Sequence, residues 1–118
     1  MSDGHALIKL LDSDGAPPRA AMWVHAPDTD TWKLWLVPYK GLTDQRDFYR
    51  RISAIISLHR DQFSAIDAGD VQMLSDSHPA ISALSRMFGM IGLSDARIVG
   101  NTLNGFYVPD GILMRMAL

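Results

Sequence analysis

The chain has 118 residues, of which 47% are hydrophobic and 20% charged, and this composition is typical of one globular domain with its own core. The formal net charge of −2 gives no global reason to expect nucleic acid or an anionic membrane as partner. The absence of cysteine excludes disulfides, thiolate catalysis and cysteine-ligated metal sites. No segment reaches the roughly 18 apolar residues of a membrane span, and the N-terminus is not typical of a signal peptide. We therefore expect a single cytoplasmic domain over residues 1–118.

Residues 5–12 carry apolar side chains at helical spacing and predict a short N-terminal helix. The two prolines that follow require extended backbone and end it. Residues 20–24 and 32–37 are rich in β-formers and flank the turn-rich segment APDTDT, which predicts an antiparallel hairpin. Both strands are apolar at nearly every position, so both faces of the hairpin should be largely covered.

All three tryptophans lie in this hairpin, and the register of its strands decides which face each indole occupies. A three-residue loop places Trp23 opposite Trp35. The same loop places His25 opposite Lys33. A four-residue loop shifts the register by one and places Trp23 opposite Leu34. We favour the first register, because it brings the two polar side chains together on the outer face, and it predicts that Trp23 and Trp35 share one face.

Three further elements are expected in the middle of the chain. Residues 43–63 predict the longest helix, with Thr43 or Asp44 as its N-cap and an apolar stripe along one side. Residues 71–75 predict a short strand. Another helix should begin close to Pro79, because proline is well tolerated in the first helical turn.

Residues 96–116 predict a terminal hairpin whose turn is Asn104–Gly105, because both residues tolerate positive φ. Pro109 interrupts the returning strand, which indicates an edge position or a bulge. The order of elements is thus α-β-β-α-β-α-β-β. It predicts an α+β fold, a two-layer sandwich in which a mixed, mostly antiparallel sheet of about five strands carries the helices on one face.

Short motifs in the chain give no established catalytic or metal-binding site. The DSDG segment at 12–15 lacks ligands at the flanking positions of a calcium loop, and the four histidines lack the spacing of a metal site. His25, Asp28 and Asp30 could gather at the first turn, where imidazole and carboxylates can bind a metal or carry acid–base chemistry. A turn role is the favoured interpretation, because aspartate is an ordinary turn residue. We expect no catalytic residue, no metal and no cofactor.

Under the favoured register, one sheet face combines aromatic and basic side chains. The candidate binding residues are Trp23, His25, Lys33, Trp35, Arg97, Asn101 and Arg115. Tryptophan, methionine and arginine are enriched at interfaces, so the leading prediction is a non-catalytic protein-interaction module, most simply a homodimer through this face. The alternative is a binder of small molecules or single-stranded nucleic acid that uses Trp23 and Trp35 as a stacking platform. Plain packing of the side chains and an enzyme centred on His25 are the remaining readings.

Three segments carry a family resemblance. They are AAMWVHAPDTDTWKLWLV at 20–37, DFYRRI at 47–52 and RIVGNTLNGFYVPDGILMRM at 97–116. Together they resemble a group of small bacterial single-domain proteins of unknown function, which share an aromatic hairpin with a W-x-L second strand and a terminal N-x-x-N-G turn. Members of that group tend to have an aromatic residue in the final strand, where this chain has Met114. The resemblance implies a bacterial protein of one domain, and it implies no activity, cofactor or catalytic residue.

Overall fold

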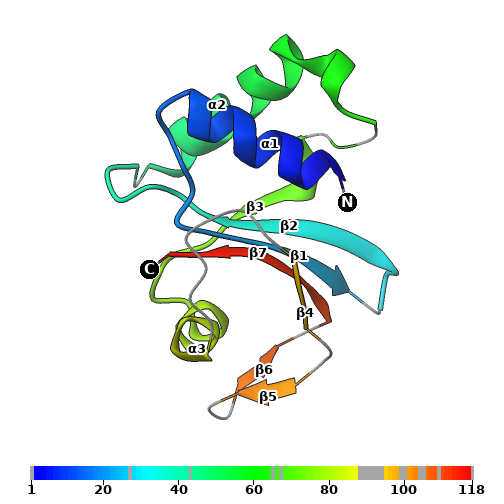
Figure 1. Cartoon of the computed structure of the whole chain (residues 1–118), viewed down its shortest axis with the longest axis vertical. Helices are drawn as coiled ribbons and strands as arrows, with labels where there is room; N and C mark the ends of the chain where they lie inside the picture. The colour runs from blue at the N-terminus through cyan, green and yellow to red at the C-terminus, as the bar shows by residue number, and fades with distance from the viewer. Residues whose placement is uncertain are drawn as a thin grey trace.

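The computed structural model describes residues 2–26, 28–42, 44–64, 66, 68–87, 95–98, 101–103, 106–108 and 110–117. Within these residues the elements follow the predicted order, with additional short strands near the C-terminus (Figure 1). They are α1 (Ser2–Ser13), β1 (Ala20–Ala26), β2 (Thr31–Val37), α2 (Gln45–Leu58), β3 (Val71–Met73), α3 (Pro79–Met87), β4 (Ala96–Ile98), β5 (Asn101–Leu103), β6 (Phe106–Val108) and β7 (Gly111–Met116). Two 3-10 turns, at Arg60–Gln62 and Ala68–Asp70, connect α2 to β3.

The main sheet has five strands in the order β3-β2-β1-β7-β4. β1 is antiparallel to both β2 and β7, and β4 is antiparallel to β7. β3 runs parallel to β2, as it can because the α2 crossover precedes it. The predicted α+β class and the mixed, mostly antiparallel sheet of about five strands are therefore confirmed.

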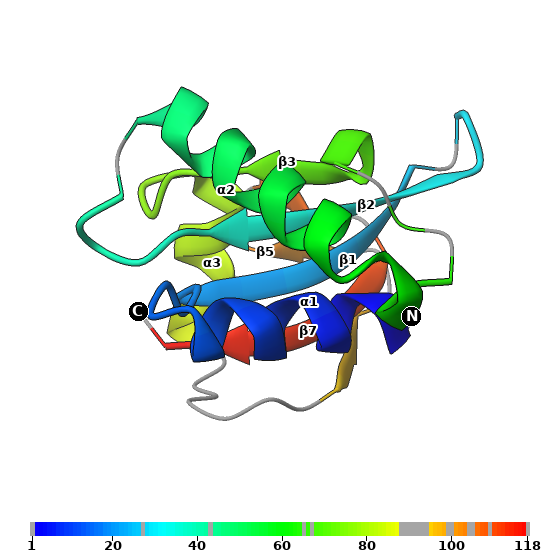
Figure 2. The ribbon, with the colours of Figure 1, turned by 90° about the horizontal axis from the view of Figure 1, so that it is seen from above.

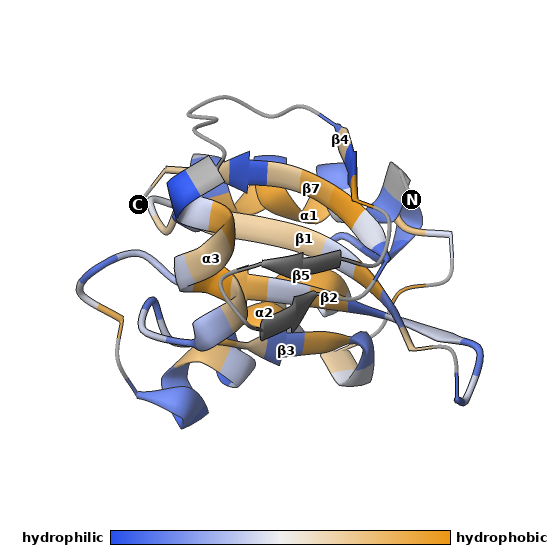
Figure 3. Cartoon of the chain, turned by 90° about the horizontal axis from the view of Figure 1, so that it is seen from below, coloured by the Kyte–Doolittle hydropathy of each residue, from blue (hydrophilic) through white to orange (hydrophobic). Residues whose placement is uncertain are grey.

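Helices lie on both faces of this sheet. α1 and α2 run side by side across one face, which we call the upper face, and they form the predicted second layer (Figure 2). α3 lies on the opposite, lower face (Figure 3). Two apolar clusters result, one centred on Leu34, Leu36 and Ile52 above the sheet and the other on Leu84 and Leu113 below it. The apolar character of both hairpin faces is explained by this double cover.

The starts of α2 and α3 follow from local capping. Asp44 has an extended backbone, and its carboxylate accepts a hydrogen bond from the N–H of Arg46 at 2.8 Å, so the predicted N-cap of α2 is confirmed. The helix ends at Leu58, earlier than expected, and the chain continues into a 3-10 turn. Pro79 occupies the first turn of α3 as predicted, and Nδ1 of His78 accepts a hydrogen bond from the N–H of Ala80 at 3.1 Å.

The favoured hairpin register is wrong. Trp23 pairs with Leu34 and Met22 pairs with Trp35, so the two indoles lie on opposite faces of the sheet. Four residues, 27–30, separate the paired ends of the strands, and Asp30 adopts a φ of 51°, which aspartate tolerates better than most residues. Trp23 is packed in the upper cluster, whereas Trp35 packs against the lower one.

The terminal segment is more divided than the predicted single hairpin. β4 pairs with β7 in the main sheet, with Arg97 opposite Ile112. β5 and β6 form a separate two-stranded ribbon that contacts α3. The predicted turn at Asn104–Gly105 and the predicted break at Pro109 lie outside the described residues. A register shift does occur, but between Ala21 and Met22, where β1 pairs with β7.

Asp3 anchors the start of α1 to the segment that precedes β3. Its side chain is buried, and its carboxylate accepts hydrogen bonds from the N–H groups of Ser64, at 2.9 Å, and Ile66, at 3.0 Å. Bonds from backbone donors to a carboxylate are stronger than neutral ones. They fix the N-terminal turn of α1, which carries His5 toward the end of the sheet.

Candidate functional site

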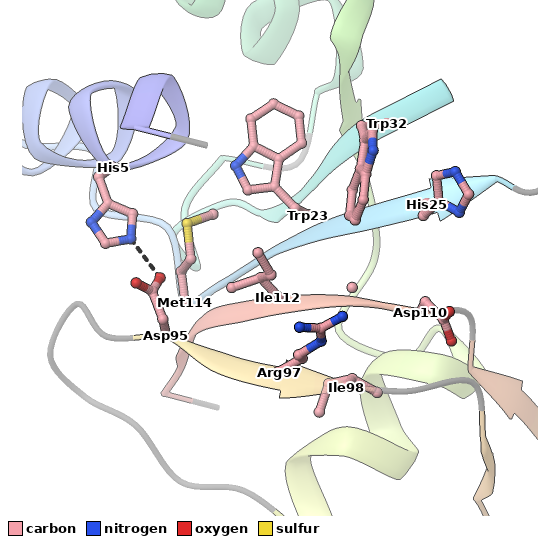
Figure 4. A pocket seen from close by; sticks show the side chains of 11 residues that line it. His5, Trp23, His25, Trp32, Asp95, Arg97, Ile98, Asp110, Ile112 and Met114 are labelled. Atoms are coloured by element: carbon pink, nitrogen blue, oxygen red, sulfur yellow. Dashed lines mark hydrogen bonds and ion pairs between the residues drawn. The ribbon is translucent and has the colours of Figure 1, made fainter. Parts of the chain in front are cut away.

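A groove of about 750 Å³ opens on the upper face, beside the N-terminal turn of α1 (Figure 4). Side chains from α1, β1, β2, β4 and β7 line it, together with residues just before β4 and β7. Sites for small molecules in proteins typically measure about 300–1,000 Å³ and combine an apolar lining with a few polar groups. The groove therefore has the size of such a site.

The apolar lining comes from two tryptophans and two side chains of β7. Trp23 and Met114 are buried beneath the groove, and Ile112 is half-buried. Trp32 is 38% exposed, which is unusual for so large an apolar side chain, and its ring centroid lies 4.9 Å from that of His25. The groove thus presents one accessible indole above an apolar floor.

Two glycines let the backbone approach Trp23 closely. A Cβ at Gly4 would collide with Nε1 of Trp23, so α1 can lie over the indole only because residue 4 has no side chain. A Cβ at Gly111 would collide with the carbonyl oxygen of Trp23. The indole is consequently held between α1 and the sheet, and its buried Nε1 has no hydrogen-bond partner within the described chain.

Two histidine–aspartate pairs flank the groove. Nε2 of His5 lies 2.7 Å from Oδ1 of Asp95, and Nε2 of His25 lies 2.8 Å from Oδ1 of Asp30. Each carboxylate fixes the orientation of its imidazole, as an orienting group does for a catalytic base. The described lining, however, contains no serine, threonine or lysine that could act as a nucleophile. The arrangement is suited to holding a ligand by hydrogen bonds.

Arg97 supplies a cation to the groove from the edge strand β4. Its side chain is exposed, and Figure 4 shows the guanidinium directed into the groove, on the side opposite the indole of Trp32. Among the described residues it has neither a hydrogen bond nor an ion pair. Asp110 also lines the groove, and its carbonyl oxygen accepts a hydrogen bond from the N–H of His25 at 2.9 Å, which ties the start of β7 to β1.

Three of the seven predicted binding residues line this groove, and the other four lie elsewhere. Trp23, His25 and Arg97 meet there. Lys33 and Trp35 lie on the lower face, since they pair with Val24 and Met22 of the lower cluster. Asn101 lies in β5, outside the main sheet, and its side chain is not among those described. The predicted single surface is thus corrected, because the hairpin register separates its members.

Arg115, the remaining predicted residue, lies outside the groove and pairs with α1. It is 8% exposed, and its guanidinium donates two hydrogen bonds of 2.8 Å to the two carboxylate oxygens of Asp12 in α1. These bonds raise the pKa of Arg115 above its usual value, against the opposing effect of burial. Because the pKa of Arg115 is raised in the folded protein, its ion pair stabilises the fold fully at pH values below the ordinary arginine pKa. This stabilisation is lost only as the pH rises through the raised value.

Comparisons with protein-family models, curated proteins and solved structures find no match.

Two negative observations concern the described residues. They contain no group of three or more histidines, cysteines, aspartates or glutamates that could hold a metal ion. No helix in the same residues is long and apolar enough to cross a bilayer. The predicted cluster of His25, Asp28 and Asp30 reduces to a single contact, between His25 and Asp30.

Several groove residues carry no signal in the sequence. His5 and Asp95 are 90 residues apart, and nothing local to either predicts their contact. The favoured register places Trp32 on the face opposite Trp23, although both line the groove. The alternative four-residue loop places both on one face, so the one signal that could have found this pair was the turn length.

Proposed function

We propose that this protein is a non-catalytic binding protein that holds a small molecule in the groove beside α1. The observation that carries the proposal is an accessible indole, that of Trp32, which faces the cation of Arg97 across an apolar floor, and this cation has no partner among the described residues. Stacking and charge then act on the same ligand. The stacking residue is Trp32, and the buried Trp23 also lines the groove, in place of the predicted pair of Trp23 and Trp35.

A fragment screen followed by nuclear magnetic resonance tests this proposal. Fragments that bind should shift the backbone and indole signals of groove residues such as Trp32 and Ile112. Ile112→Trp fills the floor and should weaken binding at least tenfold. Leu58→Trp adds the same side chain at a position that is 79% exposed and outside the groove, so it should leave binding unchanged. Fragments whose shifts cluster elsewhere, or an unaffected Ile112→Trp variant, would rule the proposal out.

The exposed Trp32 also supports a second candidate, a protein-interaction module that forms a homodimer. Tryptophan is enriched among the residues that dominate interface energies, and β2 presents this indole next to the hairpin loop. On this candidate the wild type is a dimer in light scattering at micromolar concentration, and Trp32→Ser is a folded monomer. A monomeric wild type excludes it. A bacterial origin and a cytoplasmic location remain part of our proposal, on the grounds of the resemblance and the composition.

A further inference from the structure

We infer that the ligand of the groove is an aromatic monocarboxylate, whose carboxylate binds Arg97 and whose ring stacks on Trp32. The inference rests on the proposed small-molecule function and adds the chemical class of the ligand. Two observations support it: most charged groups of the groove already have a partner in the protein, and the accessible aromatic surface lies on one side of the groove.

Among the described residues of the groove, one cation remains available to pair with a ligand. The imidazoles of His5 and His25 are each in contact with a carboxylate of the protein. Arg97 makes no such contact within the described chain, although it lines the same groove. A guanidinium presents a planar fork of N–H donors that matches the two oxygens of a carboxylate. Arg97 is therefore the group that selects an anionic ligand.

The remaining charges favour one negative charge on the ligand over two. Asp95 lines the groove with its carboxylate held by His5, and Arg97 is the one guanidinium of the described lining, so a dianion such as a phosphate monoester would carry a second charge that no further unpaired cation of that lining balances. Like charges in a partly desolvated groove repel more strongly than in bulk water. A ligand with one carboxylate satisfies Arg97 and adds the least repulsion.

The shape of the groove requires the rest of the ligand to be flat and apolar. Trp32 exposes part of its indole on one side, while Ile112 and the buried Met114 form the floor. Aromatic rings stack favourably on an indole in an offset arrangement. Figure 4 shows the indole and the guanidinium on opposite sides of the groove, so a bicyclic ring with a short acidic side chain can contact both.

Three probes with the same ring test the inference by calorimetry on the full chain at pH 8. They are 1-naphthylacetate, the neutral 1-naphthylacetamide and the dianionic 1-naphthyl phosphate. We expect 1-naphthylacetate to bind at least tenfold more tightly than either of the other two. Arg97→Gln should weaken 1-naphthylacetate at least tenfold and leave the amide unchanged. Arg86→Gln, an exposed arginine of α3 outside the groove, is the matched control and should have no effect.

Other outcomes overturn the inference in distinguishable ways. Equal binding of the acid and the amide, or an unaffected Arg97→Gln variant, shows that the groove does not select an anion, while small-molecule binding itself stands. Tighter binding of the phosphate shows that the ligand class is wrong. If no naphthyl probe binds although fragments occupy the groove, the aromatic monocarboxylate is also excluded. If the groove binds neither the naphthyl probes nor any fragment, both the inference and the proposed function are excluded.

Discussion

Replacing Gly111 with alanine is expected to destabilise the fold by about 3 kcal/mol, the upper range for overpacking a well-packed site. The new Cβ would collide with the carbonyl oxygen of Trp23 and lie 2.8 Å from Cε of Met22. The methionine can rotate away, but the carbonyl belongs to the central strand β1 and cannot move without separating it from β7. Urea unfolding followed by circular dichroism measures the change.

Gly41→Ala is the control for this prediction. A Cβ at Gly41 would lie 3.0 Å from Cε2 of Tyr39, whose half-exposed ring can turn aside. We expect a loss below about 1 kcal/mol, as for most surface substitutions. If Gly111→Ala were as stable as the wild type, the close approach of Gly111 in β7 to the carbonyl of Trp23 in β1 would be contradicted. The geometry of the groove floor would be contradicted with it.

Asp12→Ala is expected to cost about 3 kcal/mol, because it leaves the guanidinium of Arg115 buried without its carboxylate. Breaking a buried ion pair by removing one partner typically costs about 3–5 kcal/mol. The lower end applies here, since the side chain of Asp12 is 36% exposed and water can partly replace it. Adding Arg115→Met should recover part of the loss, because the double variant no longer buries an unpaired charge.

The neighbouring pair of Asp14 and Arg51 is the control. Its atoms approach to the same 2.8 Å, but the two side chains are 50% and 36% exposed, respectively. Exposed ion pairs contribute about 0–1 kcal/mol, so Asp14→Ala should change stability little. Equal losses for Asp12→Ala and Asp14→Ala would show that burial of Arg115 does not govern its contribution.

The elements of this fold could be predicted from the sequence because their signals are local. The cap at Asp44 and the proline at position 79 each act within one helical turn. The apolar stripe of α2 and the β-formers of β1 and β2 likewise require no knowledge of the rest of the chain. The sheet class follows from their order.

The hairpin register could not be predicted, because the polar side chains of the two strands have partners outside the pairing of the strands. The favoured register rested on bringing His25 and Lys33 together, but His25 contacts Asp30, and Lys33 donates a hydrogen bond of 2.8 Å to the carbonyl of Gly69. The packing of Gly4 against Trp23 joins segments on different elements. Local sequence permits both loop lengths, and tertiary packing selects one.

Strict alternation also failed at Arg115, which was expected on a surface with Trp35. The register shift in the pairing of β1 with β7 lets Met114 and Arg115, neighbours in sequence, both lie on the upper face. A two-residue period holds only where strands pair without irregularity. The candidate site was therefore only partly predictable: Trp23, His25 and Arg97 do lie together in the groove, whereas Arg115 lies against Asp12 of α1.

The pairing of Ile98 with Gly111 closes the main sheet across the whole excursion that contains β5 and β6. The strands β5 and β6 thus form a side branch that leaves the main sheet after Ile98 and returns to it before Gly111. The entropy of closing such a branch depends only weakly on its length. Changes of length in β5 and β6 should therefore be tolerated, at the expense of contacts with α3, while the neighbouring pair of Arg97 and Ile112 keeps its place in the groove. The ribbon of β5 and β6 can thus vary in evolution without altering these two groove residues.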